Sequence, residues 1–211
     1  MIIEFYGLPG SGKTTISRTL AERGGKYVYL HTSPRFETIR LVPLFAFKNP
    51  GKALFWFCEL FKESMKFHFG TLFRYKLHLL LISIAQYQQA QRNAETVYLL
   101  DEGLFQRILS IYETKKTRED IERYIRHIPK VDIVVIAENK STEFYRFKES
   151  PHRYESPRLH LGKEYFENWM EVVRYNDAII KSVLKGTQKN IVVCDGAKGL
   201  GNCMDKIEKE V

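Results

Sequence analysis

Cysteine is scarce in this sequence, with only three among 211 residues. Cys58, Cys194 and Cys203 show no C-x-x-C spacing, which excludes the usual zinc and redox motifs, and their odd number does not suit a disulfide framework. Disulfides are also rare in proteins of reducing compartments. We therefore expect three reduced thiols and a cytoplasmic location.

Long hydrophobic runs are missing as well. No uncharged apolar stretch reaches the roughly 18 residues that a membrane-spanning helix needs, so we expect no transmembrane segment. Residues 2–6 already read as a strand, so we expect no cleaved signal peptide before them. Internal repeats and low-complexity linkers are also absent. The length and the uninterrupted pattern predict one domain over residues 1–211.

Acidic residues are fewer than basic ones. The 25 Asp and Glu residues are outnumbered by 33 Lys and Arg residues, which gives a formal net charge of +8. This balance favours polyanionic ligands such as nucleotides, sugar phosphates, nucleic acid or acidic lipid. Net charge does not choose among them, so the class of ligand has to come from motifs.

The clearest motif is residues 7–14, Gly-Leu-Pro-Gly-Ser-Gly-Lys-Thr, which fits the phosphate-binding pattern G-x-x-x-x-G-K-[ST] at every position. Apolar residues before it favour a buried strand, and apolar side chains at helical spacing follow it. In such a strand–loop–helix unit, backbone N–H groups of the glycine loop and the helix N-terminus bind phosphate. The lysine reaches the β- and γ-phosphates of ATP, and the threonine hydroxyl joins the ligands of Mg²⁺. The expected nucleotide-binding residues are Gly7, Gly10, Ser11, Gly12, Lys13, Thr14 and Thr15.

Two adjacent acids end the strand expected over residues 96–101. A carboxylate at this position can hold Mg²⁺ through water or take the proton from an attacking hydroxyl. Because side chains alternate along a strand, Asp101 and Glu102 cannot both point inward. We expect Asp101 to be the catalytic carboxylate and metal ligand, with Glu102 as the alternative. Arg107, on the helix expected next, lies within reach of the same site.

Basic residues follow the second strand, expected over residues 26–31. The carboxyl ends of parallel strands form the ligand-binding edge of an open sheet. This places Arg35 and Arg40 near the phosphoryl acceptor, although two solvated surface arginines fit the pattern equally well. The expected acceptor-binding residues are Arg35, Arg40, Glu102 and Arg107.

Residues 44–92 form a helical region rich in aromatic residues, with helices expected over residues 52–69 and 71–92. On the first helix the charged residues share one face and the other positions are apolar. Those charged residues are Lys52, Glu59, Lys62, Glu63 and Lys66. So wide an apolar surface indicates burial, a substrate pocket, a partner or a membrane surface. The mixed charges argue against an anionic-lipid anchor, so we favour packing in the core or across a homodimer.

A polar segment with two prolines, residues 149–162, follows the strand expected over residues 131–137. Arg146 stands on a short helix before it and Arg153 within it. Basic residues on a mobile loop can close over a triphosphate and neutralise its charge during transfer. An ordinary surface loop is the alternative.

Five strand segments separated by helices predict a three-layer α/β/α sandwich around a five-stranded parallel sheet. With its P-loop, its acid-bearing third strand and the arginines after its fourth strand, the whole chain resembles the P-loop kinases of small molecules. This nucleoside and nucleotide kinase group includes the thymidylate kinases. The resemblance implies the strand order 2-3-1-4-5. Thymidylate kinases have Asp-Arg-[Tyr/Phe] where this chain has Asp-Glu-Gly at residues 101–103.

The resemblance also implies roles for single residues. Lys13 and Thr14 would bind phosphate and Mg²⁺, Asp101 would be the carboxylate after the third strand, and Arg146 and Arg153 would be lid arginines. The expected function is ATP-dependent phosphoryl transfer to a small hydroxyl- or phosphate-bearing acceptor, nucleoside- or nucleotide-like. The alternatives are a kinase acting on a nucleic-acid end or base, and a non-enzymatic ATP-dependent switch.

Overall fold

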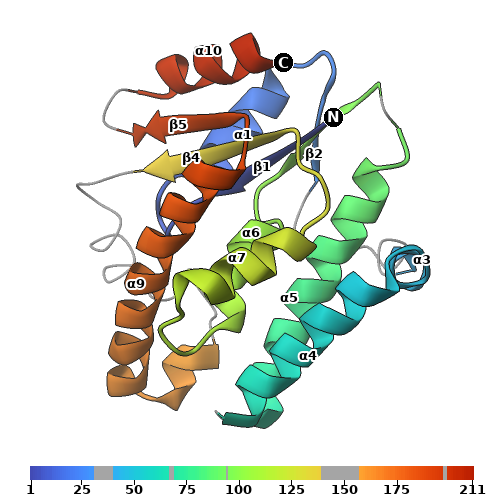
Figure 1. Ribbon diagram of the computed structural model, residues 1–211. Helices are drawn as coiled ribbons and strands as arrows, with labels where there is room; N and C mark the ends of the chain where they lie inside the picture. Colours follow the sequence, from blue (N-terminus) through green and yellow to red (C-terminus); the bar gives the residue numbers. More distant parts are fainter. Residues whose placement is uncertain (31–39, 67–68, 94, 139–156, 197–198) are drawn as a thin grey trace.

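The computed structural model describes residues 1–30, 40–66, 69–93, 95–138, 157–196 and 199–211 (Figure 1). Its centre is a five-stranded sheet in the order β2-β3-β1-β4-β5. Every strand pair is parallel, as the register Ile3 to Leu99 and Glu4 to Val134 illustrates. The strands are β1 (Ile2–Tyr6), β2 (Tyr27–Leu30), β3 (Val97–Leu100), β4 (Ile133–Glu138) and β5 (Ile191–Asp195).

Helices cover both faces of this sheet, which makes three layers (Figure 1). On one face, α1 (Lys13–Glu22) and α10 (Leu200–Glu210) bury Ile16, Leu20 and Ile207 against β1, β3, β4 and β5. The larger core lies on the other face. The remaining helical segments are α3 (Leu41–Lys48), α4 (Pro50–Lys66), α5 (Phe69–Ala90), α6 (Leu104–Ile111), α7 (Arg118–His127), the 3₁₀ turn η2 (Pro157–Leu161) and α9 (Lys163–Thr187). The α/β sandwich and the strand order predicted from the sequence are thus confirmed.

The central strands are mostly apolar because both faces of a covered parallel sheet are buried. All five residues of β1 and all four of β3 are buried. One of them is a carboxylate, Glu4, which has no solvent exposure. That exception lies beside the P-loop and belongs to the site described below.

The aromatic-rich region packs into the larger core, in agreement with the burial favoured from the sequence. Phe45 and Trp56 stack with ring centroids 5.8 Å apart, and both are fully buried. Figure 1 shows α3, α4 and α5 together at one side of the molecule.

The charged residues that the sequence places on one face of α4 do not share one environment. Glu59 and Glu63 are buried, at 9% and 1% exposure, whereas Leu54 and Met65 are exposed at 64% and 60%. The reason is tertiary, since polar groups from α7 and from the loop between α6 and α7 bond these two carboxylates. The Tyr112 hydroxyl donates to Glu59 at 3.0 Å and Lys116 Nζ lies 2.7 Å from Glu63.

Two cysteines expected as reduced thiols are instead joined. Cys194 at the end of β5 and Cys203 on α10 form a disulfide, while Cys58 is free and exposed. The two residues are nine apart in sequence, and their Cα atoms lie 5.1 Å apart.

No helix among the described residues is long and apolar enough to cross a membrane. The lid-like loop expected over residues 149–162 lies outside the described residues except for its last part, which includes η2.

Candidate functional site

The P-loop joins β1 to α1, as the motif requires. Gly12 precedes the first residue of α1 with φ 92°, in the left-handed region where a side chain would be strained. The Ser11 N–H donates to the Leu8 carbonyl at 3.1 Å and closes the turn. The ammonium of Lys13 donates to the carbonyls of Gly7 and Leu8 at 2.9 and 3.0 Å, so the lysine curls back over its own loop.

Two features of this loop suit a phosphate ligand. The Ser11 hydroxyl is buried and has no hydrogen-bond partner among the described residues. The loop also leads into the N-terminus of α1, where partial positive charge gathers. Thr15 is exposed on the first turn of that helix. The loop therefore keeps donors for an anion at the position that the motif predicts.

The end of β3 brings Asp101 against this loop. The Thr14 hydroxyl donates to Asp101 Oδ2 at 2.7 Å, and the Tyr29 hydroxyl donates to the same oxygen at 3.1 Å. Burial raises the pKa of Asp101 above its ordinary value, and the Glu102 carboxylate adds to the rise, while Thr14, Lys13 and Tyr29 counteract it. Asp101 is the inward-pointing acid, at 4% exposure, as the sequence predicts.

The residues at this point fit a magnesium ion held partly by a nucleotide. Asp101 Oδ1 is buried and has no partner among the described residues. The other oxygen of that carboxylate, Oδ2, accepts the hydrogen bond from the Thr14 hydroxyl. One carboxylate and one hydroxyl match the few protein ligands that Mg²⁺ takes when phosphates and water supply the rest. Within the described part of the chain, no group of three or more His, Cys, Asp or Glu residues could hold a metal by itself.

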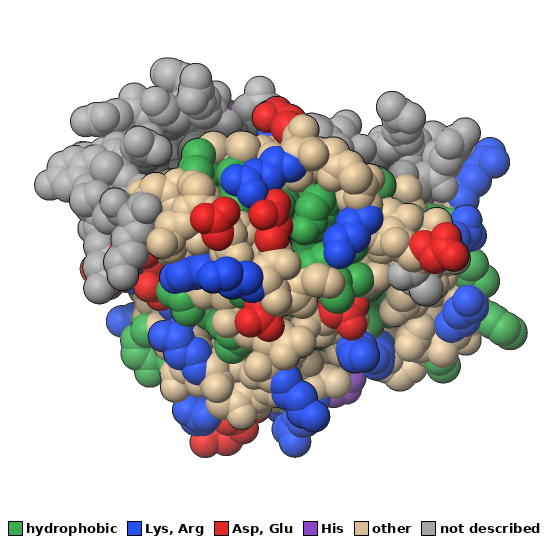
Figure 2. All heavy atoms as spheres, turned by 90° about the horizontal axis from the view of Figure 1, so that it is seen from above, with side chains coloured by type: hydrophobic (Ala, Val, Ile, Leu, Met, Phe, Trp, Pro, Cys, Tyr) green, Lys and Arg blue, Asp and Glu red, His purple; other side chains and the backbone are tan. Residues whose placement is uncertain are grey.

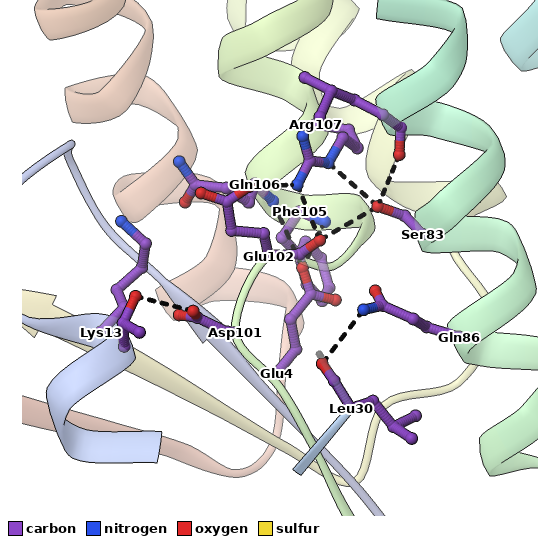
Figure 3. Close-up of polar contacts among 12 residues, drawn as sticks. Glu4, Lys13, Leu30, Ser83, Gln86, Asp101, Glu102, Phe105, Gln106 and Arg107 are labelled. Atoms are coloured by element: carbon purple, nitrogen blue, oxygen red, sulfur yellow. Dashed lines mark hydrogen bonds and ion pairs between the residues drawn. The ribbon is translucent and has the colours of Figure 1, made fainter. Parts of the chain in front are cut away.

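Glu102 points the other way and pairs with Arg107 (Figure 3). Arg107 Nη2 lies 2.6 Å from Glu102 Oε2, and Arg107 Nε donates to the Ser83 hydroxyl of α5 at 3.0 Å. The Arg107 side chain is 2% exposed, but that of Glu102 is 40% exposed. Burial alone would raise the pKa of Glu102, but Arg107 and Lys13 lower it below its ordinary value. The two adjacent acids are thus shifted in opposite directions.

The buried carboxylate of Glu4 fixes the start of α6. It accepts the N–H groups of Phe105 and Gln106 at 2.7 and 3.3 Å, and it is also bonded by the Tyr87 hydroxyl. It therefore satisfies N–H groups of the first helical turn that otherwise have no partner. Burial raises the pKa of Glu4 to about 7, with these hydrogen bonds and Arg107 acting against the rise.

This carboxylate also explains the glycine that follows the two acids. A Cβ atom on Gly103 would lie 2.3 Å from the Glu4 carboxyl carbon, so no larger residue fits without movement. A side chain such as the Tyr or Phe of the thymidylate kinase pattern is thereby excluded at position 103. Gln106, one turn further, accepts the Gly7 N–H at 3.2 Å and ties α6 to the P-loop.

The other predicted site residues are only partly placed. Arg40 is exposed and occupies the N-cap position of α3, without a side-chain capping hydrogen bond. Arg35, Arg146 and Arg153 lie outside the described residues. Of the acceptor set, the structure therefore brings together only Glu102 and Arg107.

Sequence reasoning did not include Glu4, Tyr29 or Ser83 in the site. Glu4 carries a usable signal, because a charged residue in an otherwise apolar buried strand needs a partner. Tyr29 and Ser83 show no comparable signal, since each reaches the site only through the packing of β2 and α5.

No family model and no curated protein matches the sequence. Among solved structures, deoxyadenosine kinase from M. mycoides with the products dCMP and dCDP bound is similar over 100% of this chain and 98% of its own, with TM-score 0.54 and 17% identity. The same enzyme with bound dATP is similar over the same shares, with TM-score 0.54 and 19% identity. Thymidylate kinase from Ehrlichia chaffeensis reaches TM-score 0.46 at 17% identity over 99% of this chain and 97% of its own.

At these identities the likeness concerns the fold, over the full length of both chains. The P-loop, the acid after β3 and the strand order all occur within that shared architecture. The chain therefore has the fold of deoxyadenosine kinase, a P-loop nucleoside kinase.

Proposed function

We propose that this protein is an ATP-dependent phosphotransferase that acts, with Mg²⁺, on a small nucleoside- or nucleotide-like acceptor. The observation that carries the proposal is the bond between the Thr14 hydroxyl of the P-loop and Asp101 at the end of β3. A loop that only bound phosphate would not need a carboxylate beside its hydroxyl. Metal-assisted transfer needs both.

The reaction that this site suits is transfer of the γ-phosphoryl group. An acceptor oxygen forms the new bond to the γ-phosphorus, the bond from that phosphorus to the bridging oxygen breaks, ADP leaves, and the acceptor proton passes to a base. Lys13 and the P-loop N–H groups would bind the phosphates. Thr14 and Asp101 would hold the magnesium ion, which supplies neutralisation of phosphate charge.

Asp101 and Glu102 have different access to an acceptor. Asp101 already accepts two hydroxyl hydrogen bonds and is buried, which suits metal anchoring. Glu102 is partly exposed, which suits contact with an acceptor hydroxyl, but Arg107 and Lys13 lower its pKa and so make it a weaker base. We keep Asp101 as the catalytic carboxylate acting through the metal, with Glu102 as the alternative base.

The acceptor class rests on the fold and on the charge of the site. The similar structures are of an enzyme crystallised with deoxynucleotides. Arg107, with Ser83 beside it, offers a cation and hydroxyl at the carboxyl edge of the sheet, where ligands of open α/β sheets bind. The lid arginines Arg146 and Arg153, the acceptor arginines Arg35 and Arg40, and a cytoplasmic location remain predictions.

The test is release of ADP from ATP and Mg²⁺ in the presence of single deoxynucleosides, nucleoside monophosphates and sugars. We expect turnover with at least one nucleoside or nucleotide, and a loss of at least about 100-fold in the Lys13→Ala variant. Lys189→Ala, which removes an exposed lysine far along the chain, is the control and should keep full activity.

Two results would replace the proposal. Turnover only with oligonucleotides, with strong dependence on salt, would make the protein a nucleic-acid kinase. ATP binding that depends on Lys13 but no turnover with any acceptor would indicate a nucleotide-dependent switch.

A further inference from the structure

A stripe of large apolar side chains faces solvent on α4. Leu54, Phe57, Phe61 and Met65 are exposed at 64, 48, 44 and 60%, and they follow one another at the three- and four-residue intervals of one helical face. Phe47, at the end of α3 just before α4 begins, is 86% exposed. These five residues, which we call the apolar stripe, are most of the large exposed hydrophobic side chains of the described residues.

The stripe is held in place by the core side of its own helix. Phe57 and Phe61 each contact Phe73 of α5 edge-on, with ring centroids 6.4 Å apart. The opposite face of α4 buries Trp56 and Leu60 in the larger core. Rotating α4 to hide the stripe would therefore expose the core residues, so the exposure is built into the fold.

The charges that flank the stripe have one sign. Residues 40–90 contain two acids, Glu59 and Glu63, and both are buried and bonded to partners from other elements. The exposed charged residues in the described part of this range are all basic. They are Arg40, Lys48, Lys62, Lys66 and Arg74, with Lys52 half-exposed.

The basic residues of α4 border the apolar stripe, and Arg74 lies on the neighbouring helix α5. Lys62 lies about 80° round α4 from Leu54, and Lys66 follows one turn later. Arg74 is next to Phe73 on the α5 side. At the lower right edge of Figure 2, the side on which α3 and α4 lie in Figure 1, hydrophobic and basic side chains protrude together.

We propose that the apolar stripe and its basic border dock the protein onto an anionic lipid surface. A helix that lies in a membrane interface buries an apolar face among the acyl chains and presents Lys and Arg to anionic headgroups. Here both acids of α4 are buried, so no exposed acid of that helix stands beside Lys62, although Lys66 is paired with Glu63. The inference does not rest on the proposed phosphotransferase activity.

Charge also decides against a second copy of the chain, the homodimer considered from the sequence. In a two-fold interface the same patch meets itself. Lys62, Lys66 and Lys48 would then approach the lysines of the partner, with no exposed acid on either α4 to neutralise them. Like charges brought together in an interface oppose association.

The test is sedimentation of the full chain with vesicles. We expect binding to vesicles of phosphatidylcholine mixed with phosphatidylglycerol, no measurable binding to phosphatidylcholine alone, and weaker binding as salt is raised. The triple variant Phe47→Gln, Leu54→Gln and Met65→Gln changes only side chains at least 60% exposed, and should bind at least about tenfold more weakly. Leu200→Gln, at an apolar residue 42% exposed on α10, is its control and should bind as the parent does.

A second pair of variants tests the contribution of the basic residues separately. Lys48→Glu with Lys62→Glu should weaken binding by at least about 20-fold, because each basic residue near an anionic surface contributes about fivefold. Lys185→Glu with Lys189→Glu makes the same change in net charge on another surface and should have little effect. No vesicle binding by the parent at low salt, or equal losses in both charge variants, would overturn the proposal. A dimer in sedimentation equilibrium that the triple variant abolishes would show that the stripe is a self-interface.

Discussion

At the scale of single residues, the two neighbouring carboxylates at the end of β3 have different surroundings and therefore different expected roles. Asp101 is buried against the P-loop hydroxyl, and Glu102 is half-exposed against a guanidinium. Substitution of each by its amide keeps the shape and removes the charge.

We expect Asp101→Asn to lower kcat by about 10²–10⁴-fold and to raise the Mg²⁺ concentration needed for half-maximal activity. Glu102→Gln should leave the Mg²⁺ requirement unchanged, and any loss should appear in kcat. The measurement is initial rate against Mg²⁺ at saturating ATP. A shifted Mg²⁺ requirement in Glu102→Gln alone would mean that the two roles are reversed.

Glu4 gives a second prediction at this scale, in the pH dependence of stability. Its pKa is raised from 4.5 to about 7 on folding, so the folded state binds its proton more tightly than the unfolded state does. The stabilisation from that proton is complete below about pH 4.5 and is lost as pH rises through about 7. The parent should therefore lose about 2–3 kcal/mol of unfolding free energy between pH 5 and pH 8 relative to Glu4→Gln.

The experiment is urea unfolding of the two proteins at both pH values. Taking the difference between them cancels the other titrating groups, including Glu63 and Glu113, whose lowered pKa values act with the opposite sign. Parallel pH profiles in the parent and the variant would contradict a raised pKa at Glu4.

At the scale of elements, the short turn η2 is attached to α6 and α9 through one buried cation. The Arg158 side chain is 2% exposed, is paired with Glu113 just after α6, and lies with its guanidinium carbon 4.3 Å from the Trp169 ring centroid on α9. Lys76 of α5 is 2.8 Å from the same carboxylate. Burial would raise the pKa of Glu113, but Arg158 and Lys76 hold it below its ordinary value.

Arg158→Ala should lower the free energy of unfolding by about 3 kcal/mol, because a buried charge loses one of its two cations and the aromatic ring loses its contact. Lys163→Ala, which breaks a pair with Glu167 between side chains 85% and 59% exposed, should cost less than about 1 kcal/mol. Denaturant unfolding of both variants measures the difference. Equal small losses would show that the buried network contributes little.

At the scale of the whole molecule, the aromatic region of α3–α5 and the sheet share one core. Trp56 on α4 and Trp169 on α9 belong to the same buried cluster as Tyr6 of β1. A shared core predicts that these parts unfold together, even though α3, α4 and α5 lie between β2 and β3 along the chain.

The two tryptophans are the only ones in the chain, so each can report separately. Trp56→Phe leaves Trp169 as the probe and Trp169→Phe leaves Trp56. We expect fluorescence and circular dichroism to give coincident unfolding transitions within each variant. A fluorescence transition that precedes the loss of helix in the variant that keeps Trp56 would show that α3–α5 unfolds as a separate unit.

The sequence by itself determined the P-loop, the five strands and the three layers. These features follow from local sequence patterns. The glycine spacing is the one that a phosphate-binding loop requires, and the apolar runs need a sheet that is covered on both faces. The inward direction of Asp101 also followed, because side chains alternate along a strand.

Only the tertiary structure decided which face of α4 meets solvent, why position 103 is glycine, and that Cys194 and Cys203 are joined. Helical periodicity predicts that Glu59 and Glu63 share one face of α4. It does not predict that Tyr112 and Lys116 lie opposite them. Gly103 is required by Glu4, 99 positions earlier in the chain, and the disulfide joins Cys194 of β5 to Cys203 of α10. Each of these outcomes depends on a residue that folding brings close from elsewhere in the chain. For Glu4, Glu59 and Glu63, the cost of burial depends on the groups that bond the carboxylate in the folded protein and not on its neighbours in sequence.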